Sequence, residues 1–94
     1  MEIRYSNHLL IRIKMRGIPY DLPCVIYQRA PQRFHDTESG VDIAVARDKY
    51  AGKMRLMAVA YRLHPSYISL ITIHPLKPHQ LENRISSGRW KELG

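Results

Sequence analysis

Three ionisable side chains, His8, Arg12 and Arg16, recur at every fourth residue within the stretch YSNHLLIRIKMRGI. On an α-helix this spacing places them in one stripe about 80° wide, because successive residues turn by about 100°. Apolar residues lie on both sides of the stripe, whereas a surface helix normally has one apolar stripe and one wide polar face. The stripe is therefore expected at the lip of a groove, where guanidinium groups suit phosphate oxygens or carboxylates. The alternative is an ion pair between these arginines and an acid of the chain, for which the candidates are Asp21, Asp36 and Asp42.

Three further ionisable side chains lie near the end of the sequence. His74 follows the apolar segment YISLITI, Lys77 lies in a loop between Pro75 and Pro78, and Arg84 comes after this loop. Metal-independent RNA cleavage needs a base for the 2′-hydroxyl proton, an acid for the leaving oxygen and a cation for the phosphorane. Histidine supplies the base or the acid near neutral pH, and arginine or lysine supplies the cation.

These two groups form one candidate site if the first helix meets the end of the apolar strand. The predicted catalytic residues are then His8, Arg12 and His74. The residues predicted to bind RNA or its phosphates are Arg16, Lys77, Arg84, Tyr61 and Tyr67. The two tyrosine rings would stack on unpaired bases, unless they form a cross-strand pair with each other. Alternatively, His74 caps the strand end through a backbone hydrogen bond.

The composition describes one small basic domain, residues 1–94. Its length suffices for a single core, and its apolar content of 45% is ordinary for a globular protein. A net charge of +7 and a pI near 9.9 predict attraction to phosphate-bearing or acidic partners, although such charge also keeps a protein in solution. No apolar run reaches about 18 residues, so no membrane span is expected.

The cysteine and histidine pattern predicts neither a metal site nor a cofactor. Cys24 is the only cysteine, which fits a reducing cytoplasm, and it is expected as a small packed apolar residue. The sequence contains no cysteine pair, no His-x-x-x-His helix and no glycine-rich phosphate loop. We therefore expect a cytoplasmic protein that works with its own side chains.

Local signals predict an α+β fold. Ser6 is a good N-cap and Gly17 a natural stop, which predicts a first helix over residues 7–16, and a second is expected over residues 22–29. Alternation and short turns then predict three or four antiparallel strands, in the segments QRFHD, VDIAVARDKY, KMRLMAVAYR and YISLITIH. A third helix, HQLENRISS, is expected after Pro78. These helices are expected to pack on the sheet.

The pattern S-x-H-x-x-x-R-x-x-x-R-G-I, from Ser6 to Ile18, resembles the opening signature of an uncharacterised bacterial family, domain of unknown function 4258. The likeness continues in order through a second helix, strands containing IAVAR and MAVAYR, and a closing LITIHP. That family resembles small toxins of the BrnT and RelE type, which are endoribonucleases neutralised by an antitoxin. The resemblance implies a RelE/BrnT-like fold, RNA or the ribosome as target, and an acidic antitoxin-like partner. The sequence departs from BrnT-type chains at Met15-Arg16-Gly17, where they usually carry Lys-His-Gly.

The expected function is that of a small basic toxin-like protein that binds RNA and acts as a metal-independent endoribonuclease. The alternative is a binding module without catalysis, which takes an acidic protein partner, or a structural domain. The salt dependence of the binding affinity separates these alternatives, because binding through several phosphates weakens steeply as the salt concentration rises.

Overall fold

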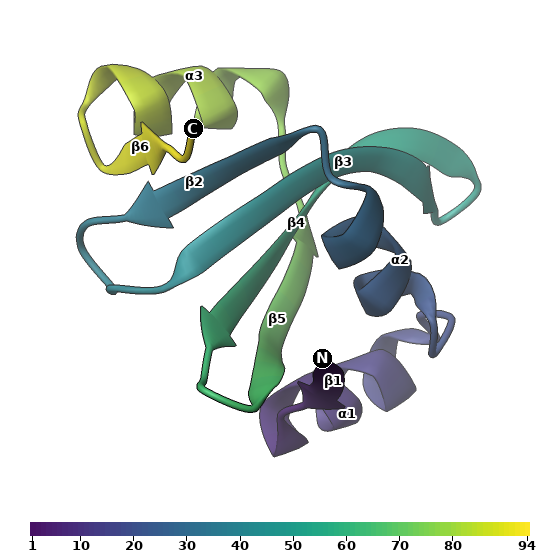
Figure 1. The fold of residues 1–94 in the computed structure, drawn as a ribbon. Helices are drawn as coiled ribbons and strands as arrows, with labels where there is room; N and C mark the ends of the chain where they lie inside the picture. The colour runs from purple at the N-terminus through teal and green to yellow at the C-terminus, as the bar shows by residue number, and fades with distance from the viewer.

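A six-stranded mixed sheet with three helices forms the computed structural model, which describes residues 1–94 (Figure 1). The elements in chain order are β1 (Glu2–Tyr5), α1 (Asn7–Arg16), α2 (Leu22–Arg29), β2 (Gln32–Asp36), β3 (Asp42–Tyr50), β4 (Lys53–Leu63), β5 (Tyr67–Pro75), α3 (Pro78–Ser86) and β6 (Trp90–Glu92). The strands lie in the order β1-β5-β4-β3-β2-β6. The β1–β5 pair is parallel, and every other neighbouring pair is antiparallel.

The α+β class is confirmed, and α1 and α2 span the predicted residues. The predicted sheet needs correction, because it has six strands instead of three or four and one of its pairs is parallel. The two missed strands, β1 and β6, have four and three residues, which is too short for an alternating pattern to be visible. Each forms only through pairing with a strand distant in sequence, β5 for β1 and β2 for β6.

Local hydrogen bonds explain where α1 begins and ends. The Ser6 Oγ accepts a hydrogen bond from the Leu9 N–H at 3.1 Å, which satisfies one free donor of the first turn. Gly17 ends the helix in the left-handed conformation, with φ at 62°, and its N–H donates to the Ile13 carbonyl. None of the three helices is long and apolar enough to cross a membrane.

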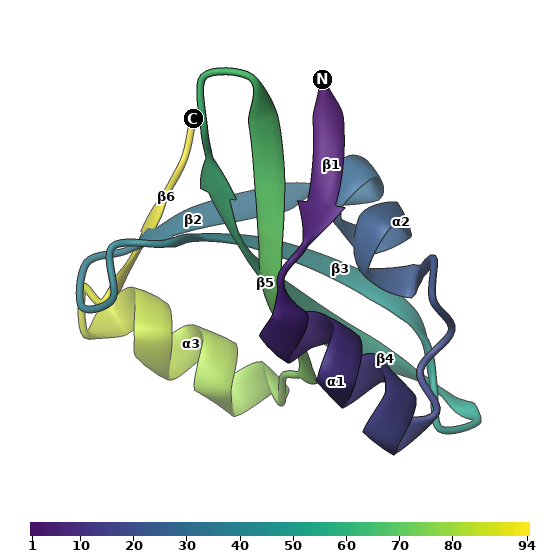
Figure 2. The ribbon, with the colours of Figure 1, turned by 90° about the horizontal axis from the view of Figure 1, so that it is seen from below.

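The sheet carries helices on both faces, so the core has two parts. On one face, α1 and α2 cover a cluster of 13 buried residues that includes Leu9, Ile26 and Leu70. On the other face, α3 covers a cluster of seven that includes Phe34 and Trp90. Figure 2 shows α2 and α3 on opposite sides of β2 and β3. We call these the α1–α2 face and the α3 face. The nearly continuous apolar sequence of β4 follows from this arrangement, because both of its faces are covered.

Asp36 is the only charged residue buried in the protein, at 3% exposure, and it ties β6 to the sheet. Its carboxylate accepts hydrogen bonds from Arg89 Nη2 at 3.2 Å and from Trp90 Nε1 at 3.2 Å. The backbone N–H groups of Glu38 and Ser39 donate to it as well. Burial by itself would raise the pKa of Asp36, but these donors hold it well below its usual range. Trp90 therefore packs back into the core of its own chain.

Candidate functional site

A β-bulge in β5 decides which face of the sheet His74 occupies. The strand carries one extra residue, Ile71, where its register with β4 shifts. Simple alternation from Leu70, which belongs to the α1–α2 face, would place His74 on that same face. The bulge reverses the alternation, and His74 pairs with Ala58, whose side chain belongs to the cluster on the α3 face. His74 therefore lies on the face that α3 covers.

The same bulge holds the beginning of α1. The Ser6 N–H donates to the Leu70 carbonyl at 2.9 Å, and the Ser6 Oγ donates to the Ile71 carbonyl at 3.0 Å. Since Ser6 is also the N-cap, one hydroxyl joins the helix to the bulged strand. Arg12 follows on this helix and is half-buried. The position of its guanidinium relative to β5 therefore depends on the Ser6 contact.

His74 is half-buried and lies within the fields of two arginines. Burial lowers the pKa of its imidazole, and the positive charges of Arg84 on α3 and Arg12 on α1 lower it further. In Figure 2 the end of β5 lies between α1 and α3. Neither arginine forms an ion pair with a carboxylate of the chain. At neutral pH the imidazole is therefore uncharged and able to accept a proton beside two permanent cations.

His8 joins this group through Arg12. Its Nε2 lies 3.4 Å from Arg12 Nη2, and the side chain is exposed. Arg84 is held on the other side, with its guanidinium carbon 5.2 Å from the centre of the Trp90 ring. We call His8, Arg12, His74 and Arg84 the His74 cluster. All four were singled out in the sequence, three as catalytic and Arg84 as phosphate-binding.

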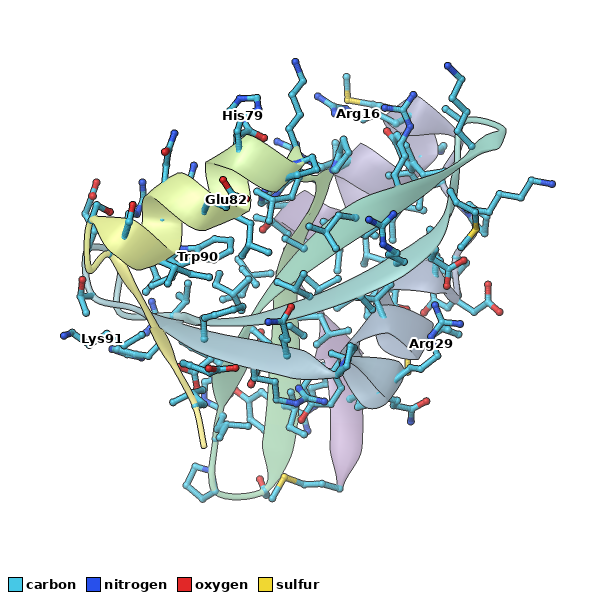
Figure 3. All side chains as sticks on the ribbon, turned by 90° about the horizontal axis from the view of Figure 1, so that it is seen from above. Arg16, Arg29, His79, Glu82, Trp90 and Lys91 are labelled. Carbon is cyan, nitrogen blue, oxygen red and sulfur yellow. The ribbon has the colours of Figure 1, made fainter.

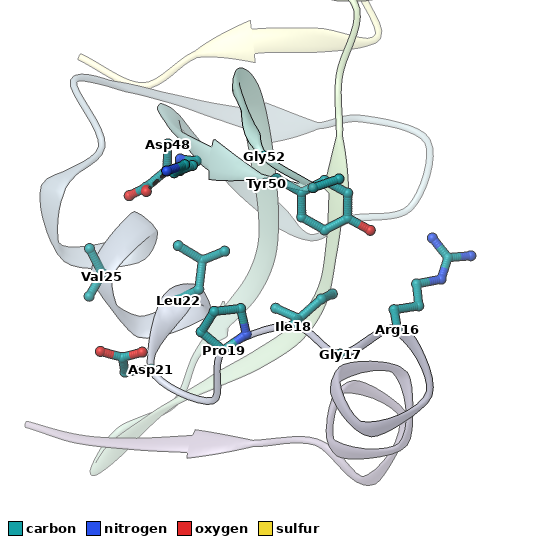
Figure 4. Close-up of a pocket in the computed structure, with 12 residues that line it drawn as sticks. Arg16, Gly17, Ile18, Pro19, Asp21, Leu22, Val25, Asp48, Tyr50 and Gly52 are labelled. Carbon is teal, nitrogen blue, oxygen red and sulfur yellow. Dashed lines mark hydrogen bonds between the residues drawn. The ribbon is translucent and has the colours of Figure 1, made fainter.

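Arg16, at the C-terminal end of α1, lines a small hollow on the helix surface together with His8 and Arg12. It also lines a cavity of about 560 Å³ between the α1–α2 connection and the β3–β4 hairpin. Figure 4 shows Arg16 and Tyr50 on one side of this cavity and Asp21 and Asp48 on the other. The ion pair with an acid, considered for Arg12 and Arg16, does not form at either residue.

Lys77 also lines a separate cavity, of about 430 Å³, together with Arg47 and Arg55. These two arginines were not singled out in the sequence. The available signal was their place on two strands joined by a short turn, which brings both to the same end of a hairpin.

The two tyrosines proposed for base stacking do not face each other. Tyr61 pairs with Leu70 on β5, and its side chain is 3% exposed and packs edge-on against Tyr27. Tyr61 is therefore a core residue, and the prediction that its ring stacks on an RNA base is wrong. Tyr67 is partly exposed, lies parallel to the His64 ring at 4.2 Å, and carries the Arg4 guanidinium over its ring.

Acidic side chains are scarce around the His74 cluster. The chain contains none between Asp48 and Glu82, and five of its eight acids form ion pairs elsewhere. Among the 15 Lys and Arg residues, those in ion pairs are Arg4, Arg29 and Arg89. Figure 3 shows Arg16 of α1 and His79 of α3 projecting from the same side of the molecule. Most of the positive charge therefore has no carboxylate partner in the chain.

The geometry combines an uncharged half-buried imidazole, two uncompensated guanidinium groups and a second, exposed imidazole. Side chains of these kinds can bind phosphate oxygens and can accept a proton next to them. No three His, Cys, Asp or Glu side chains converge anywhere in the structure. Comparison with protein-family models, with curated proteins and with solved structures finds no match to this chain.

Proposed function

We propose that this chain binds RNA at the His74 cluster and cleaves it by a metal-independent reaction. The observation that supports the proposal is the half-buried His74, which lies in the fields of Arg12 and Arg84 with no carboxylate paired to either arginine. A structural arginine in a partly buried place normally pairs with an acid. Phosphate oxygens would supply the missing negative charge here.

The proposed reaction assigns one step to each kind of side chain. His74 takes the proton from a 2′-hydroxyl, and the 2′-oxygen attacks the adjacent phosphorus. Arg12 and Arg84 stabilise the negative charge that develops on the phosphorane oxygens. The bond to the 5′-oxygen then breaks, and His8 donates the proton that this oxygen takes up. The products are an RNA end with a 2′,3′-cyclic phosphate and an RNA end with a 5′-hydroxyl.

The opening motif adds a family expectation to this proposal. His8 and Arg12 belong to the motif that resembles the domain of unknown function 4258 family, and both lie in the His74 cluster. We therefore retain, as part of the proposal, a RelE/BrnT-like fold, RNA or the ribosome as target, an acidic antitoxin-like protein as partner and a cytoplasmic location.

Cleavage is tested with single-stranded RNA in the presence of a metal chelator, both free and on translating ribosomes. We expect a 2′,3′-cyclic phosphate product that is absent when the RNA carries 2′-deoxy nucleotides. His74→Asn should lower the cleavage rate by at least about 100-fold, since general-base catalysis contributes about that much. The matched control is Lys91→Gln on β6, which should cleave at the wild-type rate. No product in either setting would exclude the cleavage reaction.

Binding is tested separately by its salt dependence. Each phosphate contact that is lost should reduce the slope of log affinity against log salt by about 0.7 for a single strand. We expect this reduction in Arg12→Gln and Arg84→Gln, and no change in the Lys91→Gln control. A slope near zero in the wild-type protein would argue against RNA binding.

A second candidate function, docking of an acidic protein without catalysis, is favoured by one observation on α1. Ile11 and Met15 are 58% and 80% exposed and lie beside Arg12 and Arg16 around a small hollow of about 130 Å³. A protein partner would cover the apolar and the charged side chains together, whereas RNA would use mainly the charges. Met15→Ser should therefore leave RNA binding unchanged, but weaken the binding of an acidic amphipathic peptide.

A further inference from the structure

A second cluster of uncompensated cations surrounds a cavity between the β3–β4 hairpin and the β5–α3 connection. The cavity has a volume of about 430 Å³ and is lined by nine residues. Three of these residues are cations, which are Arg47 on β3, Arg55 on β4 and Lys77 before α3. None of the nine is acidic. The register of β3 with β4 places Arg47 and Leu56 on one face of the sheet and Arg55, opposite Asp48, on the other face. Arg47 and Lys77 therefore supply the charge of this cavity, and no acid lines it.

The cations around the hairpin end have no carboxylate partners. Arg47 and Lys77 form no ion pair, and neither does Arg55. The Arg55 Nε donates to the Tyr50 carbonyl at 3.3 Å, which leaves its two terminal nitrogens without a partner. Two of the cations stand on paired strands, so their backbone positions are rigid.

The walls of the cavity are apolar and well supported. Leu76 is 4% exposed, and its N–H donates to the Leu56 carbonyl at 2.8 Å. Pro75 and Pro78 bracket the same connection and line the cavity as well. The first turn of α3 also lines it, and the positive end of the helix dipole adds to the local potential. A volume of this size lies within the usual range of small-molecule sites, about 300–1000 Å³.

We infer that this cavity is a binding site for a compact phosphate group, either a terminal phosphate or a diphosphate. A phosphodiester carries one negative charge, whereas a terminal phosphate carries about 1.5 to 2 at neutral pH. Two cations therefore match a terminal phosphate or a diphosphate better than a link within an RNA chain. The apolar walls fit the carbon skeleton attached to the phosphate. The site lies next to the His74 cluster along β5, but does not depend on RNA cleavage there.

The ligand has two possible sources with the same chemistry, a free nucleotide or the phosphorylated end of an RNA strand. The probes are inorganic pyrophosphate, a nucleoside diphosphate, and one oligonucleotide prepared with either a 5′-phosphate or a 5′-hydroxyl. Binding is measured by calorimetry and by the thermal unfolding midpoint, against sodium chloride at matched ionic strength. A preference for the 5′-phosphate over the 5′-hydroxyl identifies the strand end as a ligand. Binding of the diphosphate alone identifies the free nucleotide.

The variants are Arg47→Gln and Lys77→Gln, with Arg62→Gln as the control, because Arg62 is an exposed cation of β4 outside this cavity. Each cavity variant should weaken pyrophosphate binding by at least about tenfold, the effect of losing one charge-assisted hydrogen bond. The control should bind as the wild-type protein does. Equal loss in Arg62→Gln, or no stabilisation by any phosphate compound beyond sodium chloride, would overturn the inference.

Arg84→Gln separates this site from the His74 cluster. It should weaken RNA binding and leave pyrophosphate binding unchanged. If Arg84→Gln abolishes pyrophosphate binding while Lys77→Gln does not, phosphate binds at the His74 cluster and the inference is wrong. Failure of the cleavage assay has no bearing on this outcome.

Discussion

Arginine side chains have opposite electrostatic surroundings at two places in the protein. At the β6 end, Arg89 donates to the buried Asp36 carboxylate at 3.2 and 3.3 Å. At the β5 end, Arg12 and Arg84 act on a half-buried His74, and no acid of the chain pairs with them. At the first place, a carboxylate of the chain neutralises the arginine. At the second place, the two guanidinium charges have no carboxylate, and an external anion would neutralise them.

This difference distinguishes a structural charge from a functional one. A buried carboxylate with all its donors in place stabilises the fold, and removing it leaves those donors unpaired. The guanidinium groups of Arg12 and Arg84 have no such carboxylate: Arg12 lies next to the His8 imidazole, and Arg84 lies over the Trp90 ring. Mutations should therefore change stability at the Asp36 end and binding at the His74 end.

The largest expected effect on stability comes from Asp36→Asn. An asparagine leaves the Arg89 guanidinium with only the exposed Glu38 carboxylate as its counter-charge, which should lower the free energy of unfolding by about 2–3 kcal/mol. Asp42→Asn is the matched control, since the Asp42–His35 pair is partly exposed and should matter by less than about 1 kcal/mol. Urea unfolding measures both. Equal effects of the two variants would mean that the Asp36 network is not the anchor of β6.

A pH series sharpens the same comparison. Because the folded-state pKa of Asp36 lies well below its usual range, the unfolded chain takes up a proton at a pH where the folded chain does not. The contribution of Asp36 to stability is therefore complete above the unfolded pKa, near pH 4, and is lost as the pH falls below it. The difference in unfolding free energy between wild type and Asp36→Asn should shrink between pH 6 and pH 3. A constant difference would contradict the assigned ionisation.

The smallest expected effect is a shift in the pKa of His74, measured by NMR titration of its imidazole. Arg84→Gln and Arg12→Gln should each raise the pKa of His74 toward its usual value, because each removes a positive charge that disfavours protonation. Burial remains in both variants, so the pKa should stay below that value. Lys14→Gln is the control on α1 and should leave the pKa unchanged. If one of these variants leaves the pKa of His74 unchanged, the guanidinium group that it removes does not lie near His74.

Much of the fold was predictable because its signals are local. Ser6 and Gly17 are the helix cap and stop, so the limits of α1 follow from the sequence. The central strands are long enough to show their pattern and their turns. β1 and β6 were missed because each is short and forms only against a strand from another part of the chain. Tyr61 was misjudged because alternation does not reveal which face of a sheet is buried more deeply.

The residues of the His74 cluster were predictable by type, since His8 and Arg12 share a helical stripe and His74 ends an apolar segment. Their convergence was not. Arg16 shares the stripe and a small hollow with His8 and Arg12, but it also borders a second cavity. Lys77 lines a cavity with Arg47 and Arg55 instead of with His74. Spacing along one helix fixes a direction around its axis, but the distance to another element depends on packing.

By itself, the sequence determined the charge excess, the helix limits and the chemical character of the candidate residues, because each depends on residue type and near neighbours. Only the tertiary structure decided which face His74 occupies and which cations surround it. The physical reason is the extra residue Ile71, which reverses the alternation of β5, together with the Ser6 hydroxyl that holds α1 against it. Both are contacts between segments far apart in the chain, and no local pattern specifies them.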